Sequence, residues 1–441
     1  MNIILLSGGS GKRLWPLSNE VRSKQFLKVF RKADGSKESM AQRMYRMVKE
    51  VDPEANITIA TSENQVPQIK DQLGESVGIS VEPCRRDTFP AIALASAYLR
   101  TIGVEESAPV VVCPVDPYVD IDYFECLKEM SNEVKTGSAN LVLMGIEPTY
   151  PSEKYGYIIP NSSDHISVVS EFKEKPTEDV AQKYIVSGAL WNGGVFAFRL
   201  SYLLRISEQL LGSSDYRYLY DNYSSLQKIS FDYAVVEKEK SISVIRFSGF
   251  WKDLGTWNTL TEAMDEPVSG DALADNCRNT HIINELGIPI IALGIQDAVI
   301  AATPDGLLVS SKEKSPSLKE FVSDFRPMYE RRGWGEYRVL NYKTCDDGQN
   351  SLTKELVISV DQHISYQKHQ HRTEIWTFTE GTGELILDNE VKIVKRGDVA
   401  VIEPGMKHAI KAVNGDLHII EVQIGDELTE DDIERLEWNW S

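Results

Sequence analysis

The first third of the chain alternates short apolar runs with stretches that favour helix. Four runs rich in Ile, Leu and Val have the length and composition of strands, at residues 2–6, 57–61, 109–113 and 140–145. Helix-favouring stretches lie at residues 63–73 and, rich in alanine, at 90–100. Because strands and helices alternate and the strands are apolar throughout, the pattern predicts an α/β domain with a mostly parallel sheet covered on both faces.

The pattern changes after residue 266. Residues 267–275 have the composition of a loop, and residues 280–311 contain several short β-branched runs separated by Gly, Pro and Asp. A polar linker rich in Ser, Pro and Lys follows at residues 312–319. Short strands with glycine turns then continue through residues 334–422 without a long helix, which predicts a barrel or sandwich. The acidic residues 426–437 are expected to form a solvated helix.

A chain of 441 residues is too long for one ordinary hydrophobic core, so we expect two or three domains. We place an α/β domain at residues 1–266, a small β segment with its linker at 267–330, and a C-terminal β-barrel at 331–441. The five cysteines are scattered and show no C-x-x-C spacing. They are expected to be reduced thiols in cores or on surfaces rather than catalytic residues.

The formal net charge of −19 argues against nucleic acid or an anionic membrane as a partner, because both select for clustered Lys and Arg. No apolar stretch reaches the length of a membrane span, and the opening run is too short for a signal peptide and lacks its basic flank. We therefore expect a cytoplasmic protein with small-molecule partners. A phosphate ligand would need a local basic cluster, and one is formed by Lys12, Arg13, Arg22 and Lys24.

A glycine-rich turn, Gly-Gly-Ser-Gly at residues 8–11, follows the first strand-like run. Open α/β folds bind ligands at the carboxyl edge of the sheet, and glycine lets backbone N–H groups approach phosphate oxygens closely. The run lacks the ending of a Walker A loop, so alone it favours a plain strand-to-loop turn. Arg13 and Lys24 change this interpretation, because a triphosphate and its departing pyrophosphate need opposite charge.

Residues 12–18, Lys-Arg-Leu-Trp-Pro-Leu-Ser, and residues 24–27, Lys-Gln-Phe-Leu, resemble the signature of the sugar-1-phosphate nucleotidyltransferases. Within that family the chain is most similar to the bacterial mannose-1-phosphate guanylyltransferases with a fused phosphomannose isomerase-like cupin domain. Further matching motifs follow in order, beginning at Glu82, Arg86, Cys113, Tyr155, Glu174, Trp191, Asp232 and Trp251. The resemblance implies a Rossmann-like mixed sheet in the first domain and a cupin barrel in the last.

The resemblance assigns roles to particular positions. The nucleotide would be bound by Gly8, Gly9, Gly11, Lys12, Glu82, Arg86, Asp87 and Thr88. The sugar would be bound by Gly156, Glu174, Lys175 and Asn192. The catalytic residues would be Arg13, Lys24, Asp116 and Asp253, with Mg²⁺ on the two aspartates. The residue types agree, since Mg²⁺ takes one or two carboxylates and leaves its other positions to phosphate and water.

The implied activity is that of an enzyme of GDP-mannose and polysaccharide biosynthesis. An oxygen of α-D-mannose 1-phosphate would attack the α-phosphorus of GTP and expel pyrophosphate, so the protein would contribute positioning and charge. Lys12 and Asp87 depart from the family pattern, which leaves another base or another manno-configured sugar open. A non-catalytic sensor of sugar nucleotides is a further alternative, but a sensor would not need the complete catalytic set.

Residues 365–376 and 404–408 resemble the two motifs of the isomerase-like cupin. Within the first motif, Gln367, His369 and His371 would share one face of a strand, because side chains alternate along it. The proposed metal ligands of this barrel are Gln367, His369, Glu374 and His408. Such an N/O set suits Zn²⁺ or another divalent ion.

The end of the chain leaves the role of the barrel open. The family ends in a basic segment, whereas this chain ends in Trp-Asn-Trp-Ser at residues 438–441. Mannose-6-phosphate isomerase activity would make the enzyme bifunctional. A barrel that serves only homo-oligomer formation or scaffolding is the interpretation that the altered ending favours.

Overall fold

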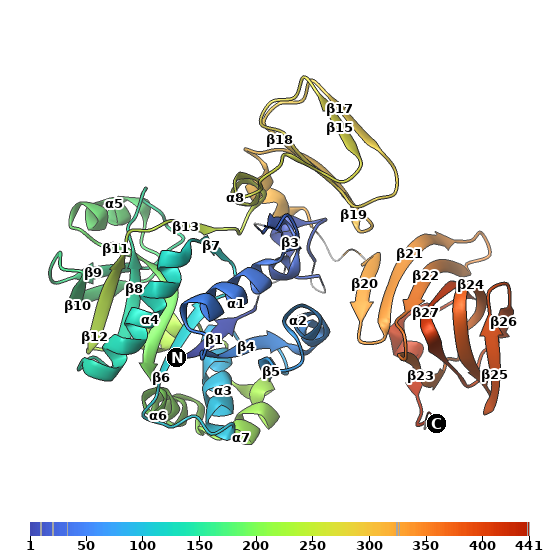
Figure 1. The fold of residues 1–441 in the computed structure, drawn as a ribbon, viewed down its shortest axis with the longest axis horizontal. Coiled ribbons are helices and arrows are strands. Elements are labelled where there is room, and N and C mark those ends of the chain that lie inside the picture. The colour runs from blue at the N-terminus through green and yellow to red at the C-terminus, as the bar shows by residue number, and fades with distance from the viewer. Residues whose placement is uncertain are drawn as a thin grey trace. The chain divides into compact units, whose positions relative to one another are not determined.

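The computed structural model describes residues 1–8, 11–19, 22–32, 34–322, 325, 327–438 and 440. The chain divides into two compact units, whose helices and strands are labelled in Figure 1. The first unit comprises Met1–Leu14 and Ser23–Pro267, and the second comprises Trp15–Arg22 and Val268–Ser441. The five cysteines are free. No described helix combines the length and the apolar character needed to cross a bilayer.

A nine-stranded mixed sheet forms the centre of the first unit. In spatial order its strands are β5 (Gly78–Glu82), β4 (Asn56–Ser62), β1 (Asn2–Leu6), β6 (Pro109–Pro114), β11 (Leu190–Arg199), β8 (Leu141–Ile146), β12 (Ile242–Phe247), β10 (Ile166–Lys173) and β9 (Tyr157–Pro160). The four strand-like runs of the sequence are therefore confirmed as β1, β4, β6 and β8.

The sheet mixes parallel and antiparallel pairs, and its parallel pairs include β8 with β12. Strands β5, β4, β1 and β6 run parallel, whereas β11 is antiparallel to both β6 and β8. The expectation of a mostly parallel sheet is wrong beyond β6, where β9 and β10 form an antiparallel pair. Most side chains of β10 are exposed, which the antiparallel part of a sheet allows because one of its faces can lie in water.

Helices pack against this sheet in two groups. One group joins α1 to α2 and α4, and the other joins α3 to α6 and α7. The helices are α1 (Met40–Val51), α2 (Val66–Leu73), α3 (Thr88–Thr101), α4 (Ile121–Thr136), α5 (Glu178–Val186), α6 (Leu200–Leu211), α7 (Tyr216–Asp221) and α8 (Trp257–Glu262). The alanine-rich α3 is buried along most of its length, which its small side chains permit. Four short strands complete the unit, β2 (Phe30–Arg31), β3 (Lys37–Glu38), β7 (Pro117–Val119) and β13 (Trp251–Asp253).

The main part of the second unit begins with a group of short strands, which we call the β-block. Its strands are β14 (Val268–Ser269), β15 (Ala272–Asp275), β16 (His281–Asn284), β17 (Ile290–Leu293), β18 (Ala298–Thr303) and β19 (Gly306–Ser311). The expected loop at residues 267–275 is wrong, because β14 and β15 each pair in parallel with a later strand. At three corners of the β-block an Asn or Asp residue has a left-handed backbone conformation, namely at Asn276, Asn279 and Asp297. The expected linker contains a short 3₁₀ helix, Ser315–Glu320.

The rest of the second unit is a β-barrel. Its strands are β20 (Tyr329–Arg332), β21 (Gly335–Thr344), β22 (Asn350–Ile358), β23 (His363–Lys368), β24 (Arg372–Leu387), β25 (Glu390–Lys395), β26 (Val399–Ile402), β27 (His408–Gly425) and β28 (Glu434–Arg435). Buried apolar side chains, including Trp376 and Phe378, fill its core.

Two features of the barrel differ from the expectation. Strands β24 and β27 are long rather than short, because their ladder continues through register shifts near Glu380 where the sequence indicates a turn. The expected helix at residues 426–437 is also wrong. That segment contains a 3₁₀ turn, Glu430–Asp432, and β28, which pairs with β23.

Candidate active site

The site of the first unit lies at the carboxyl ends of two central parallel strands. In the register of β1 and β6, Leu6 lies opposite Pro114. The two strands therefore end together, and the residues that follow them lie at the same edge of the sheet. These residues are Ser7 and Gly8 after β1, and Asp116 after β6. This edge is where open α/β sheets bind ligands.

A pocket of about 830 Å³ opens at this edge. Several residues that the sequence assigns to the nucleotide or to catalysis line it, namely Gly8, Glu82, Asp87, Thr88 and Asp116. Its size suits a nucleotide. Gly9 lies outside the described residues. Gly11 has a φ of 65°, in the left-handed region that favours glycine, and Lys12 begins a 3₁₀ turn, Lys12–Leu14.

Two adjacent arginines of this pocket region have different surroundings. Arg86 donates from Nε to the carbonyl oxygen of Tyr223 at 3.3 Å, whereas Arg85 lines the pocket. Lys228, which the sequence does not single out, also lines it. The only sequence signal for Arg85 is its place beside Arg86, and that signal does not distinguish the two side chains.

The catalytic residues expected from the sequence lie together. Lys24 Nζ is 2.7 Å from Asp116 Oδ2. Strand β13 pairs with β7 so that Asp253 lies opposite Pro117, the neighbour of Asp116. A Cβ at Gly255 would lie 3.0 Å from Asp253 Oδ2 and 3.4 Å from Arg13 Nη1, so glycine leaves room for these groups to approach.

Charge balances within this cluster. Burial raises the pKa of Asp253, Asp116 adds to that shift, and Lys24 and Arg13 oppose it. Burial lowers the pKa of Lys24, but Asp116 and Asp253 outweigh this effect and the net pKa is raised. Lys24 therefore stays protonated, while Asp116 and Asp253 repel one another. A divalent cation between the carboxylates would relieve that repulsion, so the donor set fits Mg²⁺.

The expected sugar-binding residues form a second cluster. Glu174 is buried, and its Oε2 accepts no hydrogen bond from the described residues. Lys175 Nζ lies 2.5 Å from Glu174 Oε1. The carbonyl oxygen of Gly156 accepts a hydrogen bond from the backbone N–H of Asn192 at 2.8 Å. A Cβ at Gly156 would lie 2.5 Å from Glu174 Oε2, so only glycine fits beside that carboxylate.

Asp232 joins this cluster although the sequence gives it no role. Its Oδ1 accepts a hydrogen bond from Asn192 Nδ2 at 2.6 Å. Burial, with the charge of Glu174, raises the pKa of Asp232 to about 6. The residue opens a π-helical turn, Asp232–Val236, a geometry that is frequent at functional sites. The matching Asp-Tyr-Ala-Val motif was the available signal.

The second unit holds a buried group of possible metal ligands. The ligand atoms of His369, Glu374 and His408 all lie within 4.8 Å of one another. His369 Nε2 is 3.3 Å from Glu374 Oε1, and His408 Nε2 is 3.7 Å from Glu374 Oε2. Neither ring nitrogen of His369 forms a hydrogen bond with the described residues. Buried donor atoms without partners fit a metal ion.

The other two cupin residues lie differently. Gln367 is buried, and its Oε1 accepts a hydrogen bond from the hydroxyl of Ser365 at 3.0 Å. His371 does not share a strand face with Gln367 and His369, so that expectation is wrong. Strand β23 ends at Lys368, and His371 is exposed with its Nδ1 3.4 Å from Asp426. The alternation of side chains holds only within a strand.

Comparisons with known proteins cover both parts of the chain. The nucleotidyl transferase family matches residues 2–269, and the mannose-6-phosphate isomerase C-terminal family matches residues 322–438. The mannose-1-phosphate guanylyltransferase of Salmonella montevideo is 30% identical over 98% of each chain. The xanthan biosynthesis protein XanB of Xanthomonas campestris pv. campestris (strain B100) is 32% identical over 98% of this chain and 97% of its own. A structure described as mannose-1-phosphate geranyltransferase from Thermus thermophilus covers 73% of this chain and 97% of its own, at 28% identity and a TM-score of 0.62.

The fold and the site thus define a nucleotidyltransferase with a cupin-like barrel, an enzyme that transfers a nucleotidyl group to a sugar 1-phosphate. The chain belongs to the nucleotidyl transferase family, in the group of mannose-1-phosphate guanylyltransferases that carry a mannose-6-phosphate isomerase C-terminal domain. The resemblance drawn from the motifs is confirmed. Its substrates are small molecules, and enzymes of this family use a divalent metal ion.

Proposed function

We propose that the enzyme transfers GMP from GTP to α-D-mannose 1-phosphate, yielding GDP-mannose and pyrophosphate for polysaccharide biosynthesis. The observation that carries the proposal is the cluster of Arg13, Lys24, Asp116 and Asp253 beside the pocket at the carboxyl ends of β1 and β6. The names of the relatives from Salmonella and Xanthomonas support the substrates and the pathway.

Asp116 and Asp253 would hold Mg²⁺. The bound ion would neutralise charge on the phosphates of the nucleotide. Arg13, which is exposed, and Lys24 would take phosphate oxygens of GTP and of the departing pyrophosphate. An oxygen of the sugar phosphate forms a bond to the α-phosphorus while the bond to the β-phosphate oxygen breaks. The nucleophile is already an anion, so no general base is needed.

Glu174, Asp232 and Asn192 would bind the sugar. Glu174 Oε2 is a buried acceptor that has no partner among the described residues, and it suits a sugar hydroxyl. The amide of Asn192 orients the carboxylate of Asp232, which can then accept from a second hydroxyl. Lys175 would lie against the phosphate of the sugar.

Glu82 supports guanine as the base. It lines the pocket, and its Oε2 accepts a hydrogen bond from the hydroxyl of the buried Tyr223 at 2.7 Å. Among the described residues Tyr223 is its hydrogen-bond partner, which leaves the other oxygen of Glu82 for a ligand. Guanine presents two adjacent N–H donors on its Watson–Crick edge, which a carboxylate can accept together. Adenine and the pyrimidines do not offer this pair.

The proposed pairing predicts a pH dependence. Burial raises the pKa of Glu82 to about 7, so the carboxylate becomes protonated as the pH falls through 7. We expect kcat/KM for GTP to fall roughly tenfold for each pH unit below about 7. Glu82→Gln should lower kcat/KM for GTP roughly ten- to hundredfold at pH 8, the loss of one hydrogen bond to a charged group. Pyrophosphate release with each NTP and several sugar 1-phosphates measures both.

Glu82→Gln also serves as the control for this pH profile. The substrate phosphates ionise near the same pH, and they affect both forms of the enzyme equally. The profile of the variant should therefore be flatter than that of the wild type. A preference for another NTP, or identical profiles for both forms, would contradict guanine recognition by Glu82.

We propose that the barrel binds Zn²⁺ or a similar divalent ion through His369, Glu374 and His408. His408→Ala should lower the bound metal from about one ion per chain to near zero, because a buried three-residue site loses a ligand. Nucleotidyl transfer should be unchanged, since the ligands of Mg²⁺ lie in the other unit. Metal analysis of the purified chains checks the first result, and equal metal content in both would contradict the site.

The barrel also contains a pocket of about 520 Å³ whose lining includes Glu374 and the cations Arg332, Lys354, Arg372 and Arg435. Such a lining suits a phosphorylated sugar. An assay that interconverts mannose 6-phosphate and fructose 6-phosphate distinguishes an isomerase from a scaffold. Cytoplasmic location, homo-oligomer formation, the absence of nucleic-acid and membrane partners, and the bounds of the three domains remain predictions.

A further inference from the structure

The signature segment at residues 12–27 includes residues of both units. Arg13 and Lys24 belong to the first unit, but the residues between them, Trp15–Arg22, belong to the second. We call Trp15–Arg22 the anchored segment. Each end of it is two residues from one of the two cations that the proposed function places on the phosphates.

Three side chains of the β-block hold the anchored segment by hydrogen bonds. Thr303 donates from its hydroxyl to the carbonyl oxygen of Pro16 at 3.0 Å. Asp305 Oδ2 accepts from Asn19 Nδ2 at 2.7 Å. Glu285 binds the guanidinium of Arg22 with both oxygens, at 2.5 and 2.7 Å. The contacts are spread from the start to the end of the segment.

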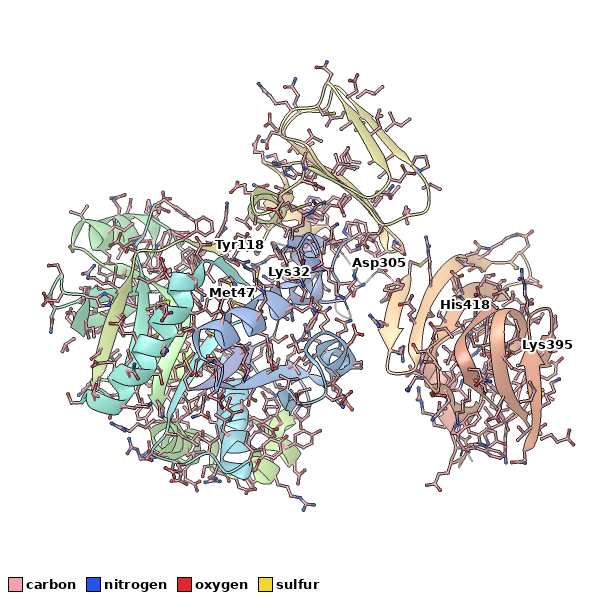
Figure 2. The ribbon with its side chains drawn as sticks, viewed as in Figure 1. Lys32, Met47, Tyr118, Asp305, Lys395 and His418 are labelled. Atoms are coloured by element: carbon pink, nitrogen blue, oxygen red, sulfur yellow. The ribbon has the colours of Figure 1, made fainter. Side chains whose placement is uncertain are left out.

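The anchors are themselves fixed. Thr303 is buried, and its hydroxyl also accepts from the backbone N–H of Asp305 at 3.1 Å. The second oxygen of Asp305, which lies in the turn between β18 and β19 (Figure 2), accepts from the N–H of Met328 at 2.7 Å. A Cβ at Gly306 would lie 2.6 Å from Cζ2 of Trp15, so the ring packs directly on the backbone of this turn.

The short distance along the chain makes this anchoring relevant to catalysis. Two residues span at most about 7 Å of extended chain, so a fixed Trp15 and a fixed Arg22 limit where Arg13 and Lys24 can lie. Charged groups accelerate phosphoryl chemistry when they are positioned before the reaction, and a misplacement of about 1 Å can cost a hundredfold in rate.

We propose that the β-block is a positioning element for nucleotidyl transfer. Through Thr303, Asp305 and Glu285 it fixes the anchored segment, and this segment restrains the backbone two residues away from each of the cations Arg13 and Lys24. This inference rests on the proposed roles of the two cations. Thr303, Asp305 and Glu285 are positioning residues, because they contact the segment and not the substrate.

Thr303→Val in the full chain tests the proposal. The change keeps the shape of the side chain and removes the hydroxyl. We expect kcat to fall about ten- to hundredfold with little change in KM for the sugar 1-phosphate. Thr303→Ser keeps the hydroxyl and should restore most of the rate. Hydrogen exchange should become faster in residues 11–24 of Thr303→Val.

Thr280→Val is a matched control from the same β-block. The hydroxyl of Thr280 is also buried, but it donates to the carbonyl oxygens of Arg278 and Ile295 and not to the anchored segment. This variant should keep the wild-type kcat and the wild-type exchange in residues 11–24. Equal losses in Thr280→Val and Thr303→Val would overturn the proposal, since the effect would then be general destabilisation.

Glu285→Gln provides a second variant, and because Glu285 is partly exposed its change should not disturb folding. We expect kcat to fall in this variant too, and wild-type kcat in both Thr303→Val and Glu285→Gln would overturn the proposal. Arg13→Ala, measured in parallel, separates this failure from failure of the proposed function. If Arg13→Ala loses its rate while both anchor variants keep theirs, only the positioning inference fails. If Arg13→Ala keeps its rate, the proposed catalytic role of the two cations is contradicted, and with it the proposed function on which the positioning inference rests.

Discussion

Asp253→Ala is expected to lower kcat for nucleotidyl transfer by about a thousandfold or more, and Asp116→Ala is expected to do the same. Each change removes one of two proposed ligands of Mg²⁺. A metal ion contributes several kcal/mol to a charged transition state, and about 4 kcal/mol corresponds to a thousandfold in rate. Steady-state pyrophosphate release at saturating GTP and Mg²⁺ measures the loss.

Folding should survive these changes. Because the pKa of Asp253 is raised, its ionised form destabilises the folded chain once the pH exceeds the ordinary carboxyl pKa. The Asp253→Asn variant should therefore melt no lower than wild type at pH 7. Asp120→Ala is a control from an exposed position near Asp116, and it should keep full activity. Near-wild-type turnover in either Asp116→Ala or Asp253→Ala would contradict the two-carboxylate site.

Arg13→Ala should lower kcat roughly 10²–10³-fold, the usual effect of losing one preorganised group that stabilises developing charge. Arg13 is exposed, so its removal leaves no hole in a core. Arg13→Lys should recover part of the rate, because the charge stays while the planar pair of donors is lost. Kinetics with GTP and mannose 1-phosphate varied in turn give kcat and each KM.

Arg217→Ala controls for the loss of a surface arginine, since the Arg217 side chain is 90% exposed. It should behave as wild type. If Arg13→Ala raised KM alone and left kcat intact, Arg13 would bind the ground state without favouring the transition state.

Local patterns in the sequence predict much of the fold. The apolar run at residues 2–6 is β1, and the alanine-rich stretch that was expected at 90–100 is the centre of α3. The sequence indicates less about elements whose partners are distant. Strands β14 and β15 are only two and four residues long, and they form because later strands pair with them. Nothing in residues 267–275 alone indicates that pairing.

The prediction of the site residues is limited in the same way, because it misses contacts between residues that are distant in the sequence. Motif order brings Arg13, Lys24, Asp116 and Asp253 into one hypothesis, and the structure places them together. The motifs assign Arg86 to the nucleotide, whereas in the structure Arg85 lines the pocket and Arg86 donates to the carbonyl oxygen of Tyr223. The local sequence does not indicate this difference, because Tyr223 lies 137 residues from Arg86. Asp232 was missed for a similar reason, since its partner Asn192 lies 40 residues away in the sequence.

The anchored segment could not be predicted from the sequence at all. All four proposed catalytic residues precede residue 266, which suggests that the chemistry is complete within the first domain. The structure adds that Thr303, Asp305 and Glu285 bind residues between Arg13 and Lys24. These contacts join positions more than 260 residues apart, as for Arg22 and Glu285, and no local pattern encodes them.

The fate of the α-phosphorus tests the central claim most directly. When the full chain is incubated with GTP labelled at the α-phosphorus, mannose 1-phosphate and Mg²⁺, the label should appear in GDP-mannose together with an equal amount of unlabelled pyrophosphate. Omission of mannose 1-phosphate should abolish both products. Label that stays in GTP, or that appears in free GMP or GDP without forming the sugar nucleotide, would contradict the account.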